Sequence, residues 1–184
     1  PDLTIFREFG EEMTKFNNYV MGTGIETVGY TVNGEACDWM YSEHDIFAYT
    51  PEIGTWNDGF WPASDRILPL AEENLHPNKF VAWAAGAMYK LNLESSEDYF
   101  VQGDTYTLNY SIKNQGLLDS EGSVYVAIQS SIYSENFLID ELATREIEYG
   151  SFQITIPTNI GGGTTIPISI SAYDNLGYEF SKSF

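Results

Sequence analysis

The sequence is poor in cysteine and in basic residues, and both shortages exclude whole classes of protein. Cys37 is the single cysteine among 184 residues, which excludes an internal disulfide framework and a cysteine-based zinc cluster. Only 8 residues are Lys or Arg, against 27 that are Asp or Glu, so the net charge is -19. Because a field of this sign repels phosphate backbones and anionic membranes, we expect no nucleic-acid partner.

Long apolar runs are also missing. No stretch approaches the roughly 20 residues of a membrane span, and no charged-then-apolar signal stands at the start. The chain opens on Pro1 rather than Met, which we interpret as a sign that it was cut from a longer precursor. Hydrophobic residues make up 43% and aromatic residues 15%, enough to build folded cores, so the acidity is expected at the surface.

The first part of the chain has the pattern of an α/β fragment. Apolar residues at three- and four-residue spacing predict a helix over 4–20. Residues 21–43 are rich in Gly, Asn and Thr, which favours a long connection with only short regular pieces. The run 46–50 is β-branched and aromatic and stops at Pro51, as is typical of a strand buried on both faces. Glu52 would then follow the carboxyl end of that strand, where ligands bind in open α/β sheets.

A second helix is predicted to begin at Ser64 or Asp65. Its apolar side chains predict an inner face formed by Ile67, Leu68, Ala71 and Leu75. We expect His76-Pro77 to end this helix, and a further short helix to follow over 78–85.

From about Ala87 the hydrophobic period changes from helical to two. Strands are expected over 88–93, 106–112, 123–132, 146–157, 165–173 and 178–184, with turn-forming residues between them. Six or seven short strands at this spacing predict an antiparallel β-sandwich of immunoglobulin-like type. We therefore expect two domains, 1–86 and 87–184, with the boundary near Gly86.

Three motifs between Tyr30 and Pro62 stand at a spacing that packing alone does not require. They are Tyr30 to Trp39, which ends in Cys37-Asp38-Trp39, then Thr50-Pro51-Glu52, then Gly59-Phe60-Trp61-Pro62. Tyr30 lies 8 residues before Asp38, and Asp38 lies 14 before Glu52. Over roughly residues 1 to 80 the chain resembles the C-terminal part of the catalytic domain of carboxypeptidase A/B-like zinc metallocarboxypeptidases.

The resemblance implies roles for five residues. Glu52 matches the general base and proton shuttle of the family, in the local pattern Thr50-x-Glu52, and Thr50 is expected to help bind the substrate. Tyr30 matches the mobile tyrosine that closes over the substrate's C-terminal residue. Asp38 matches an Asp-Trp pair near the specificity pocket, although an Asp is equally suited to cap a turn or helix. Cys37 matches the base of the pocket for the terminal side chain. Since a thiol is small, neutral and mildly hydrophobic, we expect apolar or aromatic C-terminal residues rather than basic ones.

The metal ligands that the resemblance implies are not found in this sequence. The family binds zinc through His-x-x-Glu and a later His, whereas this chain has only His44 and His76, and neither begins such a motif. The arginines that clamp the substrate's terminal carboxylate also lie upstream in the family. We therefore expect zinc in the full-length protein and none bound by this chain alone, which should not hydrolyse peptide bonds by itself.

Two functions remain open. The first is the C-terminal part of a secreted or periplasmic bacterial metallocarboxypeptidase that acts on peptide or protein C-termini, with the sandwich as an accessory domain. The second is a non-catalytic binding or adhesion module, in which the carboxypeptidase remnant only supports the sandwich. Because the apolar faces of 1–86 need sheet neighbours that the chain lacks, we also expect association with the missing N-terminal half of the domain or self-association.

Overall fold

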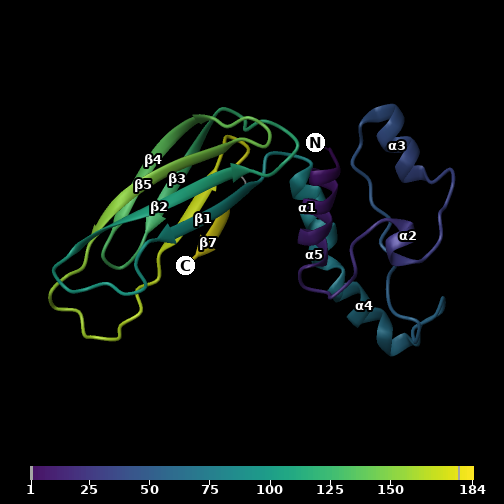
Figure 1. Cartoon of the computed structure of the whole chain (residues 1–184), viewed down its shortest axis with the longest axis horizontal. Coiled ribbons are helices and arrows are strands. Elements are labelled where there is room, and N and C mark those ends of the chain that lie inside the picture. The colour runs from purple at the N-terminus through teal and green to yellow at the C-terminus, as the bar shows by residue number, and fades with distance from the viewer. Residues whose placement is uncertain (1, 178) are drawn as a thin grey trace. The chain divides into compact units, whose positions relative to one another are not determined.

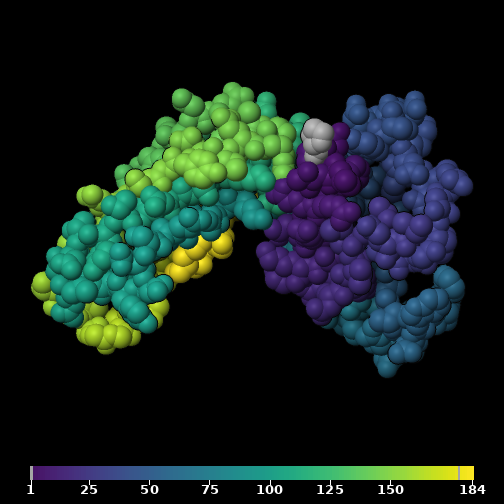
Figure 2. Space-filling view, viewed as in Figure 1, coloured from purple at the N-terminus to yellow at the C-terminus, as the bar shows by residue number. Residues whose placement is uncertain are grey.

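The computed structural model describes residues 2–177 and 179–184. The chain divides into two compact units, Pro1–Ala82 and Trp83–Phe184. The division falls within helix α5 (Leu75–Ala84), whereas the sequence predicted it near Gly86, after that helix. The first unit runs from purple to blue-teal and the second from teal to yellow (Figure 2).

The first unit is helical. Its helices are α1 (Asp2–Thr14), α2 (Gly24–Thr27), α3 (Ala36–His44), the short 3-10 helix η1 (Ser64–Arg66), α4 (Ile67–Glu73) and the start of α5. Phe9 of α1 and Phe80 of α5 are both buried and meet edge to face, with ring centroids 5.4 Å apart, so these two helices lie side by side (Figure 1). Among the described residues, no helix has the length and apolar character needed to cross a membrane.

Helix α1 is shorter than the sequence predicted. It ends at Thr14, and Phe16 and Val20 beyond it are exposed. Asn18 adopts a φ of 59°, in the left-handed region, and the Asn17 side chain accepts a hydrogen bond from the backbone N–H of Tyr19 at 3.1 Å. Asn residues favour both features, and both give the backbone an alternative to helical hydrogen bonding. The helix therefore stops here, although the apolar period of the sequence continues beyond it.

The strand predicted over 46–50 does not form, and this segment has no regular secondary structure. A strand needs a hydrogen-bonded neighbour, and the described part of the first unit contains no β-strand to supply one. Side chains hold the segment instead. The ring of Phe47 packs 4.7 Å from that of Phe6, and the Tyr49 hydroxyl donates to the backbone oxygen of Phe6 at 3.1 Å. Glu52 therefore lies in a loop rather than at the end of a strand.

The inner face predicted for the second helix was also wrong, because Ile67, Leu68, Ala71 and Leu75 are all exposed. The buried positions are instead Leu70, Asn74, Pro77 and Phe80, which repeat every three or four residues across α4 and α5. Because Asn74 and Pro77 are not typical core residues, the hydrophobic pattern did not reveal this face. The helix breaks at Asn74, earlier than predicted, and Pro77 sits in the first turn of α5, where its missing N–H costs little.

The second unit is an antiparallel β-sandwich of two sheets (Figure 1). One sheet has the order β1-β2-β5 and the other β4-β3-β6-β7. The strands are β1 (Tyr89–Ser95), β2 (Thr105–Asn114), β3 (Ser123–Gln129), β4 (Ser134–Glu141), β5 (Ile147–Thr155), β6 (Ser169–Tyr173) and β7 (Phe180–Ser183). Every pairing is antiparallel.

One apolar core joins the inner faces of both sheets. Leu91, Ile112 and Phe152 enter it from the first sheet, and Val126 and Ile170 from the second. Alternating burial along β3 shows the period of two that the sequence displayed. The chain therefore combines helices with antiparallel sheets, whereas the immunoglobulin-like type of the sandwich stays a prediction.

Candidate functional site

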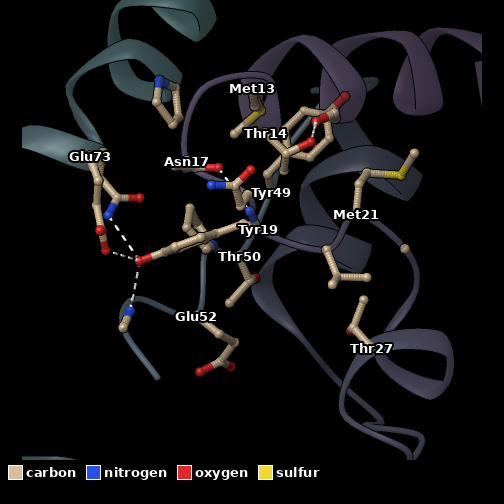
Figure 3. Close-up of a pocket in the computed structure, with 18 of the residues that line it drawn as sticks. Met13, Thr14, Asn17, Tyr19, Met21, Thr27, Tyr49, Thr50, Glu52 and Glu73 are labelled. Atoms are coloured by element: carbon tan, nitrogen blue, oxygen red, sulfur yellow. Dashed lines mark hydrogen bonds between the residues drawn. The ribbon is translucent and has the colours of Figure 1, made fainter. Parts of the chain in front are cut away.

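Glu52 borders a cavity of about 540 Å³ in the first unit (Figure 3). Its walls come from the end of α1, the loop over 17–22, the end of α2, the loop over 49–55 and the junction of α4 and α5. Two carboxylates, Glu52 and Glu73, line it, and among the described lining residues there is no Lys, Arg or His. The cavity is therefore negatively charged and opens beside the residue that the sequence singled out as a general base.

The loop that carries Glu52 is held on both sides of that residue. Before it, the Tyr49 hydroxyl donates to Phe6, and Thr50 Oγ1 lies 3.2 Å from Cys37 Sγ. After it, the backbone N–H of Gly54 donates to the Tyr19 hydroxyl at 2.8 Å. Burial raises the pKa of Tyr49, which keeps its hydroxyl protonated as a donor.

The carboxylate of Glu52 is itself exposed, and no hydrogen bond or ion pair to it is found among the described residues. Its position is therefore set by the backbone of the loop and not by contacts of the carboxylate. Oxygens that are available in this way can accept a proton from a group placed within hydrogen-bonding distance.

A second network fixes the turn that follows the loop. The Asp58 side chain is only 6% exposed, and it accepts hydrogen bonds from Arg66 Nε at 2.6 Å and from the backbone N–H and the hydroxyl of Thr55, each at 2.9 Å. The hydrogen bonds from Arg66, followed by those from Thr55, hold the pKa of Asp58 well below its usual range, and the same contact raises the pKa of Arg66. Gly54, which precedes this turn, adopts a φ of 93° that side-chain-bearing residues rarely take.

The other site residues predicted from the sequence do not all gather at this cavity. Thr50 lines it together with Glu52, and Cys37 contacts Thr50. Tyr30 and Asp38 are exposed and do not contribute to the lining that the structure describes. Asp38 lies in the first turn of α3, where a negative charge interacts favourably with the helix dipole. This position agrees with the alternative in which Asp38 stabilises the start of a helix.

Sequence reasoning missed Tyr19, the most connected side chain of the cavity. Its hydroxyl donates to Glu73 Oε1 at 2.6 Å and accepts from Gly54 N at 2.8 Å and from Asn74 Nδ2 at 3.2 Å. Figure 3 shows the three bonds meeting at this oxygen. The sequence offered no signal for Tyr19, because the hydrophobic pattern does not mark the buried face to which its partner Asn74 belongs.

The residues that the structure describes do not form a zinc site. No group of three or more His, Cys, Asp or Glu side chains placed to hold a metal ion occurs in residues 2–177 and 179–184. His44 packs its ring against Trp39, with centroids 4.8 Å apart, and His76 Nε2 lies 2.9 Å from the backbone oxygen of Glu12.

Comparisons with solved structures give only weak similarities. The sporulation control protein Spo0M of Bacillus subtilis matches at 11% identity with a TM-score of 0.38, covering 54% of this chain and 48% of that chain. The curli protein CsgC of E. coli matches at 12% identity with a TM-score of 0.28, covering 53% of this chain and 98% of that chain. The alkylpurine DNA glycosylase AlkC of Pseudomonas fluorescens matches at 15% identity with a TM-score of 0.30, covering 65% of this chain and 42% of that chain.

These TM-scores are too low to support an inference about fold or function, and the chain spans about half the length of the Spo0M structure. No curated protein matches the sequence. A family model described as zinc carboxypeptidase does match, over residues 5–77. The resemblance inferred from the spaced motifs is therefore confirmed for this segment, which contains Glu52 and all the other predicted site residues.

Proposed function

We propose that this chain is the C-terminal part of a zinc metallocarboxypeptidase that removes single residues from peptide or protein C-termini. One observation carries the proposal. Within the segment that matches the zinc carboxypeptidase family, Glu52 presents an unengaged carboxylate beside a cavity, on a loop held from both sides. In the full-length protein the metal ligands would come from sequence outside this chain, as in the family.

Each proposed residue has a limited chemical task. Glu52 accepts a proton from the attacking water and passes it to the leaving amine, which its free carboxylate allows. Tyr30 helps to hold the substrate. Its neighbourhood supports movement, because Gly29 and Gly34 flank it with φ values of 84° and 78°, and both glycines face open space.

The preference for the terminal residue rests on Cys37. Its thiol contacts the hydroxyl of Thr50, and together they form a small, uncharged surface near Glu52. Asp38 precedes Trp39 on the same helix and stands close to this surface in sequence. We propose that the substrate's last side chain is apolar or aromatic rather than basic.

The sandwich is proposed to be an immunoglobulin-like accessory domain. Its division into sheets of three and four antiparallel strands, with β1-β2-β5 facing β4-β3-β6-β7, supports this. We also propose that the parent protein is secreted or periplasmic in a bacterium, an inference that rests on the enzyme class.

The first unit is proposed to bind the upstream part of its catalytic domain or a second copy of itself. The exposed apolar side chains of α4 and α5 support this, since Ile67, Leu68 and Leu75 are 59%, 65% and 53% exposed. Trp56, Phe60 and Trp61 are almost completely exposed as well. Apolar surface of this extent usually marks an interaction site.

The test uses the full-length protein, assayed on acylated dipeptides that end in Phe or Arg. We expect faster release of Phe, loss of activity after chelation of the metal, and a fall in kcat of about 10²- to 10⁴-fold for Glu52→Gln. Glu11→Gln, an exposed glutamate of α1, is the control. Unchanged activity in Glu52→Gln would remove Glu52 from its role.

The second candidate is a binding or adhesion module without catalysis. The nearly complete exposure of Trp56, Phe60 and Trp61 favours it, because apolar surface of this kind usually marks an interaction site. A full-length protein that binds no zinc and releases no terminal residue from either dipeptide would support this candidate and exclude the enzyme.

A further inference from the structure

We infer that Tyr19 is a positioning residue for Glu52, an inference that rests on the proposed function. Tyr19 is partly buried at the cavity wall, and its hydroxyl joins three separate segments of the first unit. These are the loop after α1, the loop that carries Glu52, and the junction of α4 and α5 (Figure 3).

The three hydrogen bonds use the full donor and acceptor capacity of the Tyr19 hydroxyl. A phenol has one proton to donate and two lone pairs to accept with. The proton goes to Glu73 Oε1, and the lone pairs accept from Gly54 N and Asn74 Nδ2. Because the Glu73 carboxylate can only accept, it orients the hydroxyl so that its oxygen faces the N–H of Gly54. Glu73 and Asn74 thus hold the Tyr19 hydroxyl oxygen in place, and this oxygen accepts the hydrogen bond from the loop that carries Glu52.

The attachment acts on Glu52 through a short stretch of backbone. Gly54 lies two residues after Glu52 and has a φ of 93°, so its conformation departs from that of an ordinary loop residue. Gly54 is also confined on its other side, since a Cβ there would lie 3.3 Å from the Asp58 side chain. Because no hydrogen bond or ion pair from a described residue holds the Glu52 carboxylate, a shift of the loop at Gly54 would displace that carboxylate directly.

The variant Tyr19→Phe removes the hydroxyl and keeps the ring that fills the cavity wall. In the full-length enzyme we expect kcat to fall by about 10- to 100-fold, the range for a catalytic group displaced by about 1 Å, with KM nearly unchanged. In the 184-residue chain we expect faster hydrogen exchange at the Gly54 amide, because it loses its acceptor.

A double-mutant cycle separates positioning from a general loss of stability. If Tyr19 acts through Glu52, its substitution should cost little further activity in a Glu52→Asp background, where the carboxylate is already displaced. A purely structural effect would multiply with the effect of Glu52→Asp. Tyr41→Phe is the matched control, since Tyr41 also donates to a carboxylate, that of Asp2, but does not line the cavity.

Four outcomes decide the matter. A fall in kcat for Tyr19→Phe alone, non-additive with Glu52→Asp, supports the inference. An active enzyme in which Tyr19→Phe behaves like Tyr41→Phe overturns it and leaves the proposed function standing. Unchanged exchange at Gly54 overturns it as well. An unsubstituted full-length protein without carboxypeptidase activity overturns the proposed function and the role of Tyr19 with it.

Discussion

Asn114, at the end of β2, is predicted to stabilise the sandwich more than any exposed polar residue of the same strand. Its side chain is fully buried and makes four hydrogen bonds to backbone groups. Its amide donates to the oxygens of Leu118 and Leu142 at 2.8 and 3.1 Å, and its oxygen accepts from the N–H groups of Met88 and Gly116 at 3.2 and 3.1 Å. All four partners lie outside β2, so this side chain ties together the loops at one end of the sheets.

The substitution Asn114→Ala leaves those four backbone groups without their partner. At about 1 kcal/mol for each bond, the free energy of unfolding should fall by roughly 4 kcal/mol. This is a large share of the 5–15 kcal/mol that is typical for a domain. Asn109→Ala, at an exposed position of the same strand, should change it by less than about 0.5 kcal/mol.

Urea unfolding followed by circular dichroism gives the two free energies, and hydrogen exchange at the buried Ile128 amide reports the sandwich specifically. Equal losses for Asn114→Ala and Asn109→Ala would refute the reasoning, because they would mean that the four bonds contribute no net stability. A loss confined to Asn114→Ala, without a change in m-value, would support it.

Two further predictions concern the first unit. The pKa of Asp58 lies well below the usual 3.8, so in acid the folded protein binds fewer protons than the unfolded chain. The ionised Asp58 side chain therefore stabilises the fold above about pH 4, and this stabilisation is lost as the pH falls further. The melting temperature should therefore fall less steeply from neutral to acid pH for Asp58→Asn than for the parent or for the exposed control Asp65→Asn. Parallel curves of melting temperature against pH would contradict this. Light scattering should show the isolated chain self-associated and the Leu68→Glu variant shifted toward monomer, whereas a monodisperse parent monomer would count against an exposed docking face.

The sandwich was largely predictable, since alternating apolar residues mark strands whose partners are present in the same chain. The run over 106–112 lies within β2, and the run over 146–157 contains β5. The strand β4 was missed because it is an edge strand with only Phe137 and Ile139 partly buried, so its alternation is weak. The strand β6 starts at Ser169, later than the predicted 165, and Pro167, which lacks an N–H for the ladder, lies just before it. Residue 178, the first of the strand predicted over 178–184, lies outside the described residues.

The candidate site was predictable only in part. Motif spacing singled out Glu52 and Thr50, which the structure places on one cavity wall. It could not reveal Tyr19, because the bond from Tyr19 to Glu73 joins residues 54 apart in sequence and involves no recurring pattern. Contacts of this kind depend on how loops return in space, which neither periodicity nor local turn chemistry determines.

Two of the failed predictions in the first unit share one physical cause. A hydrophobic period reports which face a segment would bury if a partner were available. The segment 46–50 has the composition of a buried strand but no strand beside it, and the apolar stripe of Ile67, Leu68 and Leu75 faces solvent. In both cases the apolar side chains are suited to burial against a neighbouring element, and the described part of the first unit does not supply that element. In the second unit, where β2 lies between β1 and β5, the same rule succeeded. The rule itself therefore holds, and what differs is the supply of neighbours, which is the reason to look for a partner at the first unit and not at the core of the sandwich.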